Sequence, residues 1–283
     1  MIRIEGVSKK LDRFALKDIS FQIPPGYICG LIGENGAGKT SLIKLLLGLY
    51  KPDAGEIWIH GKNAEAEEAA VKNDIGYVLN EELFDKELTL LQNAELYGKY
   101  YEKYDAERFR AFCRRFELDE RKKLKKHSKG EKLKFQFAFA LAHQPSVLLL
   151  DEPTASFDPK FRQEFRKVLT EFIQDGKHSV LLATHLTSDL DRIADYIAFL
   201  HQGKLLFFMN REKLADSYRL VKGEDYKLKL LPKEKVVYKE KGEYASKALV
   251  RHNRFLAYDK EVSVDIPSIE DVMYFLIKGD SNV

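Results

Sequence analysis

The residues with the clearest chemistry are the glycines, lysine and threonine of the run Gly33-Glu34-Asn35-Gly36-Ala37-Gly38-Lys39-Thr40, which fits the pattern G-x-x-x-x-G-K-T. Glycines let a backbone fold tightly enough for consecutive N–H groups to point at one phosphate. The lysine ammonium then reaches the outer phosphates, and the threonine hydroxyl is a ligand for Mg²⁺. A chance glycine-rich turn is the alternative, but an apolar run at 27–32 and a helical segment at 41–47 flank this loop as the chemistry requires. The loop therefore predicts a nucleoside triphosphate site.

Two carboxylates follow a second apolar run. Residues 147–150 (Val-Leu-Leu-Leu) suit a buried parallel strand, and Asp151 and Glu152 stand at its carboxyl end, where open α/β sheets place their ligands. We expect Asp151 to hold Mg²⁺ through water and Glu152 to be the base that orients the attacking water. A solvated strand end is the alternative for an isolated Asp-Glu pair.

A histidine ends a third apolar run, because residues 179–183 are followed by Thr184 and His185. A lone histidine after a strand is more often structural than catalytic. Three strand ends that carry Lys/Thr, Asp/Glu and His can nevertheless converge on one phosphate. In that arrangement His185 contacts the γ-phosphate and the water.

An α/β fold is needed to position these side chains. Residues 1 to about 26 read as an antiparallel strand layer, and residues 52–62 as a turn and a short alternating strand. Residues 64–72 favour a helix, and residues of about 84–146 favour a helical subdomain. Tyr97, Tyr100, Tyr101 and Tyr104 have helical spacing there, with ordinary packing as the default and a docking surface as the alternative.

The chain changes character near residue 218, so we expect one domain at 1–217 and a small α+β appendage at 218–283. Strand-like alternation occurs over Tyr226–Leu231 and Val262–Ile266. Ser268 followed by Asp271 predicts a capped helix. One face of that helix carries Ile269, Val272, Met273 and Leu276. A docked structural cap is the default, and regulation or dimerisation are the alternatives.

In this motif order, residues 1 to about 215 resemble the ABC ATPase family of P-loop NTPases. The resemblance implies an ATPase that binds ATP and Mg²⁺, with Lys39, Thr40, Asp151, Glu152 and His185 at the family's phosphate-loop, Mg²⁺, base and switch-histidine positions. Residues 155–158 match the loop that crosses the family's dimer interface. By the same resemblance ATP contacts Gly33, Asn35, Gly36, Gly38, Lys39, Thr40 and Ser41.

The signature segment, residues 127–131 (His-Ser-Lys-Gly-Glu), departs from the family's usual Leu-Ser-Gly-Gly-Gln. Ser128 and Gly130 agree with that pattern, and the resemblance implies that they contact the γ-phosphate of ATP on an opposite subunit. A helix N-terminus with a capping serine favours an anion. Lys129 replaces a glycine and either adds a favourable charge or blocks close approach of the backbone.

Two further positions depart from the family. Asn80 stands where the family has a glutamine that reaches Mg²⁺ and the water, and asparagine has the same amide with a shorter reach. The position aligned with the family's adenine-stacking aromatic is Leu11, which has no π-face. Phe14 could substitute for it, and an ordinary core phenylalanine is the alternative.

Residues 126–130 and 184–196 narrow the resemblance to bacterial exporters for bacitracin resistance, lantibiotic immunity and phenol-soluble modulins. This implies a separate ATP-binding subunit that pairs with an integral-membrane subunit and with a second ATP-binding subunit, identical or different. The implied cargo is an antimicrobial or cytolytic peptide. The alternatives are a soluble ABC ATPase acting on ribosomes or DNA, and a regulatory nucleotide binder with weak catalysis.

Bulk composition agrees with a globular protein and gives no case for nucleic acid, because the net charge is only +3. The longest stretch without acidic or basic residues, Phe135 to Leu150, falls short of the about 20 residues that a membrane span needs. The N-terminus reads as a strand rather than a signal peptide. We do not expect a disulfide between Cys29 and Cys113, which fits a reducing cytosol. These points predict a peripheral protein at the cytoplasmic face of the cell membrane.

Overall fold

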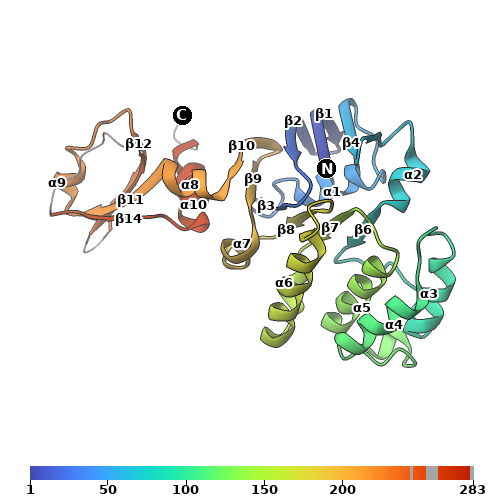
Figure 1. Ribbon diagram of the computed structural model, residues 1–283. Helices are drawn as coiled ribbons and strands as arrows, with labels where there is room; N and C mark the ends of the chain where they lie inside the picture. The colour runs from blue at the N-terminus through green and yellow to red at the C-terminus, as the bar shows by residue number, and fades with distance from the viewer. Residues whose placement is uncertain (243–244, 253–260, 281–283) are drawn as a thin grey trace.

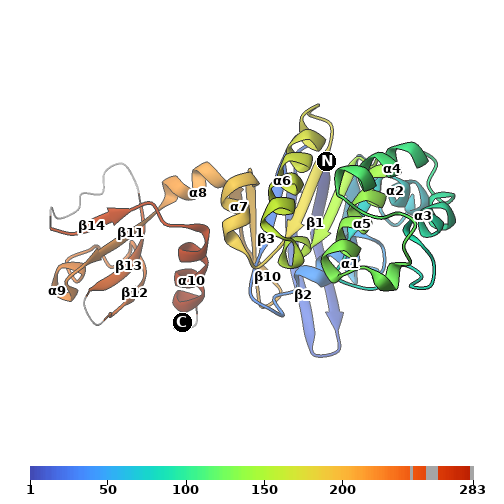
Figure 2. The same cartoon turned by 90° about the horizontal axis from the view of Figure 1, so that it is seen from below.

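A computed structural model describes residues 1–242, 245–252 and 261–280 of the chain. Figure 1 shows a larger part that contains two sheets and most of the helices, and a smaller part that follows β10 and contains a third sheet. The view from below in Figure 2 shows the same two parts side by side, with α7, α8 and α10 between them.

The central sheet has the strand order β10-β9-β3-β8-β7-β6. Its strands are β3 (Ile28–Ile32), β6 (Ile75–Val78), β7 (Val147–Asp151), β8 (Ser179–Ala183), β9 (Tyr196–His201) and β10 (Lys204–Asn210). All neighbours are parallel except β9 and β10. The three apolar runs predicted as buried strands are confirmed as β3, β7 and β8, and they are adjacent, so their carboxyl ends lie together.

A second sheet covers one face of the central sheet and is antiparallel, as predicted. Its order is β2-β1-β4-β5, formed by β1 (Ile2–Leu11), β2 (Phe14–Ile23), β4 (Ala54–Ile59) and β5 (Lys62–Asn63). Alternation along β7 shows how the two faces differ. Val147 and Leu149 join the core beneath this sheet and helix α1 (Lys39–Leu46), whereas Leu148 and Leu150 join the core on the other side.

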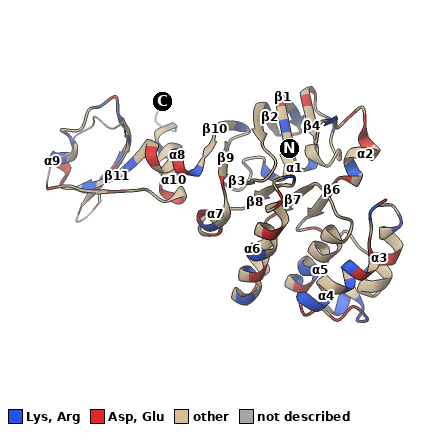
Figure 3. Cartoon of the chain, in the orientation of Figure 1, with Lys and Arg blue, Asp and Glu red and all other residues tan. Residues whose placement is uncertain are grey.

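Helices cover the opposite face of the central sheet. They are α5 (Lys129–Ala142), α6 (Pro159–Ile173) and α7 (Thr187–Ile193), which share one apolar core with the sheet. Lysine, arginine and carboxylate residues gather on the outer helices, while the central strands β3 and β8 are free of them (Figure 3). Both cysteines are buried and free, so the expected absence of a disulfide is confirmed.

The segment predicted to be helical contains no strand among its described residues. It forms α3 (Leu90–Gly98), α4 (Ala106–Arg115), a short turn η1 (Leu124–Lys126) and α5. The helix expected over 64–72 is α2 (Glu68–Asn73), preceded by turns. Tyr97, Tyr101 and Tyr104 pack on the core as the default predicts, and only Tyr100 of the four is exposed.

The third sheet has the order β12-β13-β11-β14 and is antiparallel. It is formed by β11 (Tyr218–Gly223), β12 (Val236–Glu240), β13 (Ser246–Arg251) and β14 (Ser263–Asp265), and α8 (Arg211–Ser217) leads into it. The strand predicted over Tyr226–Leu231 is wrong, because this segment starts with a helical turn, α9 (Asp225–Leu228). Only Leu228 is buried there, while Tyr226 and Leu230 are 58% and 75% exposed, so the alternation does not mark a sheet face.

The final helix, α10 (Ile269–Asp280), joins the third sheet to the rest of the molecule. The predicted cap is confirmed, since the Asp271 N–H donates to Ser268 Oγ over 3.1 Å and the Ser268 N–H donates to the Asp271 carboxylate over 3.0 Å. Ile269, Val272 and Phe275 are buried in the same core as Leu190 of α7. Helix α10 therefore packs on the helix that follows His185.

Candidate functional site

The glycine-rich loop lies between β3 and α1, as the sequence predicts. Two of its glycines permit close approaches that a side chain would prevent. A Cβ on Gly33 would lie 2.4 Å from the Leu200 carbonyl oxygen, and a Cβ on Gly38, whose φ is +109°, would lie 2.7 Å from the ring of Phe14. Lys39 folds back over the loop, because its ammonium donates to the Gly33 carbonyl over 2.8 Å and to the Glu34 carbonyl over 3.2 Å.

Asp151 lies at the end of β7 beside this loop. The Thr40 hydroxyl donates to Asp151 Oδ2 over 2.7 Å, while Asp151 Oδ1 is buried and has no hydrogen-bond partner among the described residues. Burial raises the pKa of Asp151, and the Thr40 hydrogen bond partly opposes that shift. A hydroxyl and an unpartnered carboxylate oxygen are hard donors of the kind that Mg²⁺ prefers, so the residues present fit that ion.

Glu152 lies at the mouth of the same site and adopts a left-handed backbone conformation with φ of 49°. One oxygen of its carboxylate is 2.8 Å from His185 Nδ1 and also accepts the His185 backbone N–H over 3.3 Å. The other oxygen is 3.9 Å from the Lys39 ammonium. The predicted convergence of the three strand ends is therefore present in the geometry.

A cavity of about 370 Å³ lies over the loop. A second, wider hollow of about 720 Å³ adjoins it along the turn between β1 and β2, and the two share Leu11, Phe14 and Gly36. The half-buried Phe14 ring packs on Gly38, as an ordinary core phenylalanine would. It also borders the space beside the loop, as a residue that stacks on adenine would. The first cavity is lined by Leu11, Phe14, Asn35, Gly36, Gly38, Lys39, Thr40, Ser41 and Glu152.

Asn80 is not brought to this cavity. It is exposed in the segment after β6 and is absent from the described cavity lining. Gln136 of α5, which the sequence analysis missed, holds this segment, since it accepts the Leu79 N–H over 2.9 Å and donates to the Glu81 carbonyl over 3.1 Å. The signal for Gln136 was a lone amide within an otherwise apolar helical run.

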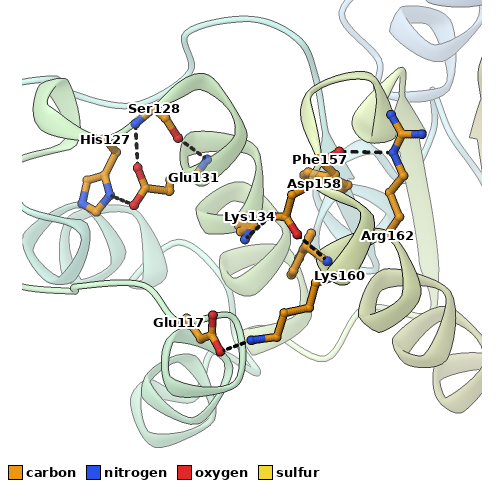
Figure 4. Close-up of polar contacts among 10 residues, drawn as sticks. Glu117, His127, Ser128, Glu131, Lys134, Phe157, Asp158, Lys160 and Arg162 are labelled. Carbon is orange, nitrogen blue, oxygen red and sulfur yellow. Dashed lines mark hydrogen bonds and ion pairs between the residues drawn. The ribbon is translucent and has the colours of Figure 1, made fainter.

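Ser128 and Gly130 also lie outside the cavity lining, at the start of α5. Ser128 is exposed and caps α5, because its hydroxyl accepts the Glu131 N–H over 3.2 Å while Glu131 accepts the Ser128 N–H over 2.7 Å (Figure 4). Gly130 has a packing role that sequence reasoning did not foresee. A Cβ at this position would lie 2.5 Å from the Ser156 carbonyl oxygen.

The segment after Glu152 is tied to α5 by a second contact. Asp158 caps α6 by accepting the Phe161 N–H over 2.8 Å, and its other oxygen is 3.3 Å from the Lys134 ammonium of α5 (Figure 4). The Lys134 ammonium also lies 4.3 Å from the centre of the Phe161 ring. The start of the signature helix and the 153–158 segment therefore form one packed unit.

Comparison with known proteins agrees with this geometry. The family model described as "ABC transporter" matches residues 16–155. The chain is 33% identical over 231 residues to the daunorubicin resistance ATP-binding protein DrrA3 of Streptomyces coeruleorubidus. That alignment covers 79% of this chain and 71% of DrrA3. The chain is 31% identical over 210 residues to the bacitracin transport ATP-binding protein BcrA of Bacillus licheniformis. That alignment covers 73% of this chain and 66% of BcrA.

Solved structures show the same fold. A solved structure of the ATP-binding subunit of an ABC transporter matches with a TM-score of 0.71 and 26% identity, and the match covers 76% of this chain and 91% of that chain. A dimeric post-hydrolysis state of the ATP-binding cassette MJ0796, bound to ADP and Pi, has a TM-score of 0.66 and 25% identity over 74% of this chain and 98% of its own. Among the described residues, none of the helices combines the length and the apolar character that a membrane span requires.

Proposed function

Because this chain belongs to the ABC transporter family as an ATP-binding and ATP-hydrolysing subunit, we propose that it powers an exporter of antimicrobial or cytolytic peptides. The observation that carries the ATPase part is the hydrogen bond of 2.7 Å between Thr40 and Asp151, with Glu152 and His185 beside it at the mouth of one cavity. The peptide part is supported by the likeness to BcrA, which is a bacitracin transport protein.

The loop from Gly33 to Ser41 binds the triphosphate of ATP through its backbone N–H groups, and Lys39 moves from the Gly33 carbonyl onto the outer phosphates. Thr40 and Asp151 would hold Mg²⁺, which supplies positive charge to the phosphate oxygens when it is bound. Glu152 accepts the proton of the attacking water, and His185 keeps the Glu152 carboxylate in place. Phe14 borders the adenine.

The working unit contains two ATP-binding subunits and a membrane-embedded component, at the cytoplasmic face of the membrane. One chain provides the phosphate loop and the signature segment once each, and these lie on different elements, α1 and α5. Two chains facing each other would let Ser128 and Gly130 of one reach the ATP on the loop of the other. Hydrolysis then separates the pair and changes access through the membrane component.

The test of the ATPase part is Glu152→Gln in the full chain. This variant keeps the volume of the side chain and removes its basicity, so it should bind ATP, accumulate as a dimer and lose at least about 100-fold in turnover. Glu95→Gln, which removes an exposed carboxylate on α3, is the matched control and should behave as the parent. Normal turnover by the Glu152 variant would show that Glu152 is not the base.

The cargo is tested separately with the chain and its membrane component in vesicles. Bacitracin should stimulate ATP hydrolysis more than daunorubicin does, if the likeness to BcrA reflects the cargo better than the likeness to DrrA3. Stimulation by daunorubicin alone would move the cargo from peptides to small organic molecules and would leave the ATPase mechanism intact.

A further inference from the structure

A polar side chain that the proposed function leaves unused lies in the hollow beside the phosphate loop. Gln202 is the first residue of the turn between β9 and β10, and it lines the hollow of about 720 Å³ together with the β1–β2 turn and Gly36. Its side chain is exposed and forms no hydrogen bond with another described residue. The amide therefore keeps its donor and its acceptor for a ligand in this hollow.

The turn that carries Gln202 is fixed in place. His201 pairs with Lys204, so the turn has only two residues, Gln202 with φ of 45° and Gly203 with φ of 79°. Two left-handed residues in succession match the twist of a two-residue hairpin. The Gly203 N–H donates to the Ala37 carbonyl over 3.1 Å, which ties the turn to the phosphate loop. Gln202 thus has a defined position relative to that loop.

The same turn also touches Phe14, which borders the adenine in the proposed function. The Gly203 carbonyl accepts the Lys17 N–H of β2 over 2.8 Å. A Cβ on Gly203 would collide with the Ala15 carbonyl oxygen and would lie 3.2 Å from the Phe14 ring, so only a glycine permits this approach. A purine that lies beside the Phe14 ring is therefore also beside the turn with Gln202.

Adenine and guanine require different partners at their edges. Adenine presents an amino donor next to the N7 acceptor, whereas guanine presents two acceptors, O6 and N7. A glutamine amide has an acceptor oxygen and a donor nitrogen side by side. The amide of Gln202 can therefore form two hydrogen bonds with this edge of adenine at once, but only one with the same edge of guanine.

The other side chains described for the hollow do not have this combination. They are apolar, or carry cationic groups that only donate, or carboxylates that only accept, apart from the single hydroxyl of Ser8. The Ser8 hydroxyl already accepts the Asp18 N–H over 2.9 Å. The Asp53 carboxylate already accepts the Lys9 ammonium over 2.7 Å. Gln202 is thus the side chain of the hollow that suits the adenine edge.

We propose that Gln202 is a specificity-determining residue that selects ATP over GTP, with its amide oxygen accepting the adenine amino group and its amide nitrogen donating to N7. This inference rests on the proposed function, because it needs the triphosphate on the phosphate loop and the base beside Phe14. Stacking on an aromatic ring does not separate the two purines, since every base has a π-face. Phe14 therefore holds a purine, and Gln202 decides which one.

The experiment uses the full chain with Glu152→Gln, which should bind nucleotide without turnover, and measures the Kd values of ATP and GTP in the presence of Mg²⁺. This parent should bind ATP about tenfold more tightly than GTP, as one bidentate contact to a base provides. Adding Gln202→Leu should weaken ATP binding and remove the preference. Adding Gln202→Arg should reverse the preference, because a guanidinium donates twice to O6 and N7 of guanine.

Gln163→Leu is the matched control, since it removes an equal amide from the exposed side of α6, and it should keep the preference of the parent. Equal binding of ATP and GTP by the parent overturns the inference alone, as does an unchanged preference in the Gln202→Leu variant. Failure of the parent to bind either nucleotide overturns the proposed function and the inference with it.

A second measurement tests the proposed hydrogen bond to N7. In 7-deaza-ATP a C–H group replaces N7, so this analogue should bind the parent about fivefold more weakly than ATP, the effect of one hydrogen bond. The Gln202→Leu variant should bind the analogue and ATP equally. A loss of the same size in both proteins, or no loss in the parent, would show that N7 does not pair with Gln202 and would overturn the inference.

Discussion

Lowering the pH should destabilise the fold through His143, the residue that ends the signature helix α5. The ring is 1% exposed and stacks on Tyr101 with 4.0 Å between ring centres. Its Nε2 is 3.1 Å from the Ile75 carbonyl of β6, and its Nδ1 is 3.3 Å from the Phe139 carbonyl. Burial lowers the pKa of His143 from 6.5 to about 4, although both carbonyls favour the charged ring.

The sign and size of this pH effect on the unfolding free energy follow from the linkage between protonation and folding. The unfolded chain binds the proton near pH 6.5 and the folded chain only near pH 4, so acid favours the unfolded chain. The stabilising contribution is complete above pH 6.5 and is lost as the pH falls toward 4. With these two values, one histidine removes about 2 kcal/mol of unfolding free energy between pH 7.5 and pH 5.

Urea unfolding of the parent and of His143→Gln at these two pH values isolates this contribution. Glutamine keeps one amide donor for the Ile75 carbonyl but cannot titrate, so the variant should lose about 2 kcal/mol less than the parent on acidification. All other titrating groups are common to both proteins and cancel in the comparison. An equal loss in both would refute the reasoning, because it would mean that His143 takes up its proton without unfolding.

Four substitutions test other contacts. Gly130→Ala places a Cβ 2.5 Å from the Ser156 carbonyl and should cost about 1–3 kcal/mol in urea unfolding; a variant as stable as the parent would remove the packing role of this glycine. Lys39→Met should abolish the rise in melting temperature that ATP gives, and retained protection by ATP would contradict the role of Lys39. The nucleotide-free variant should be at least as stable as the parent, because burial lowers the pKa of Lys39. Asp151→Asn should stabilise the nucleotide-free protein by on the order of 1 kcal/mol in urea unfolding, since burial raises the pKa of Asp151. The variant should also lose Mg²⁺-dependent hydrolysis. A variant less stable than the parent would refute the expected stabilisation. Phe275→Ala in α10 should cost about 3–5 kcal/mol in urea unfolding, and Tyr274→Ala, on the exposed side of the same helix, clearly less; equal losses would exclude docking of α10 through Phe275.

The parts of the fold that could be predicted are those with long or doubly buried patterns. The strands β3, β7 and β8 have apolar residues on both faces, so their apolar runs are continuous and their ends could be placed. The error at Tyr226–Leu231 has the opposite cause. Six residues are too few to separate a strand from a helical turn, and here the helical turn is supported by Asp225, which pairs with Lys229 one turn on and with Lys239 of β12.

The site also contains residues that the sequence could predict and one that it could not. Lys39, Thr40, Asp151 and Glu152 could be predicted because their spacing from the strands is fixed by the chemistry of phosphate and Mg²⁺, and their roles remain predictions even though the geometry brings them together. A lone amide in an apolar helical run marked Gln136 as unusual, but its role could not be predicted, because a sequence does not show which distant backbone segment such a buried amide contacts.

The contacts around α5 explain why the two halves of the site cannot move independently within one chain. In the proposed dimer, the signature segment would contact the ATP of the opposite subunit, whereas Glu152 would act on the ATP of its own. Gly130 rests on Ser156, and Lys134 pairs with Asp158, so the first turns of α5 are packed directly on the residues that follow Glu152. If a neighbouring subunit displaced α5 as proposed, it would either break the Lys134–Asp158 pair or shift the 153–158 segment with it. Both changes would alter the surroundings of Glu152.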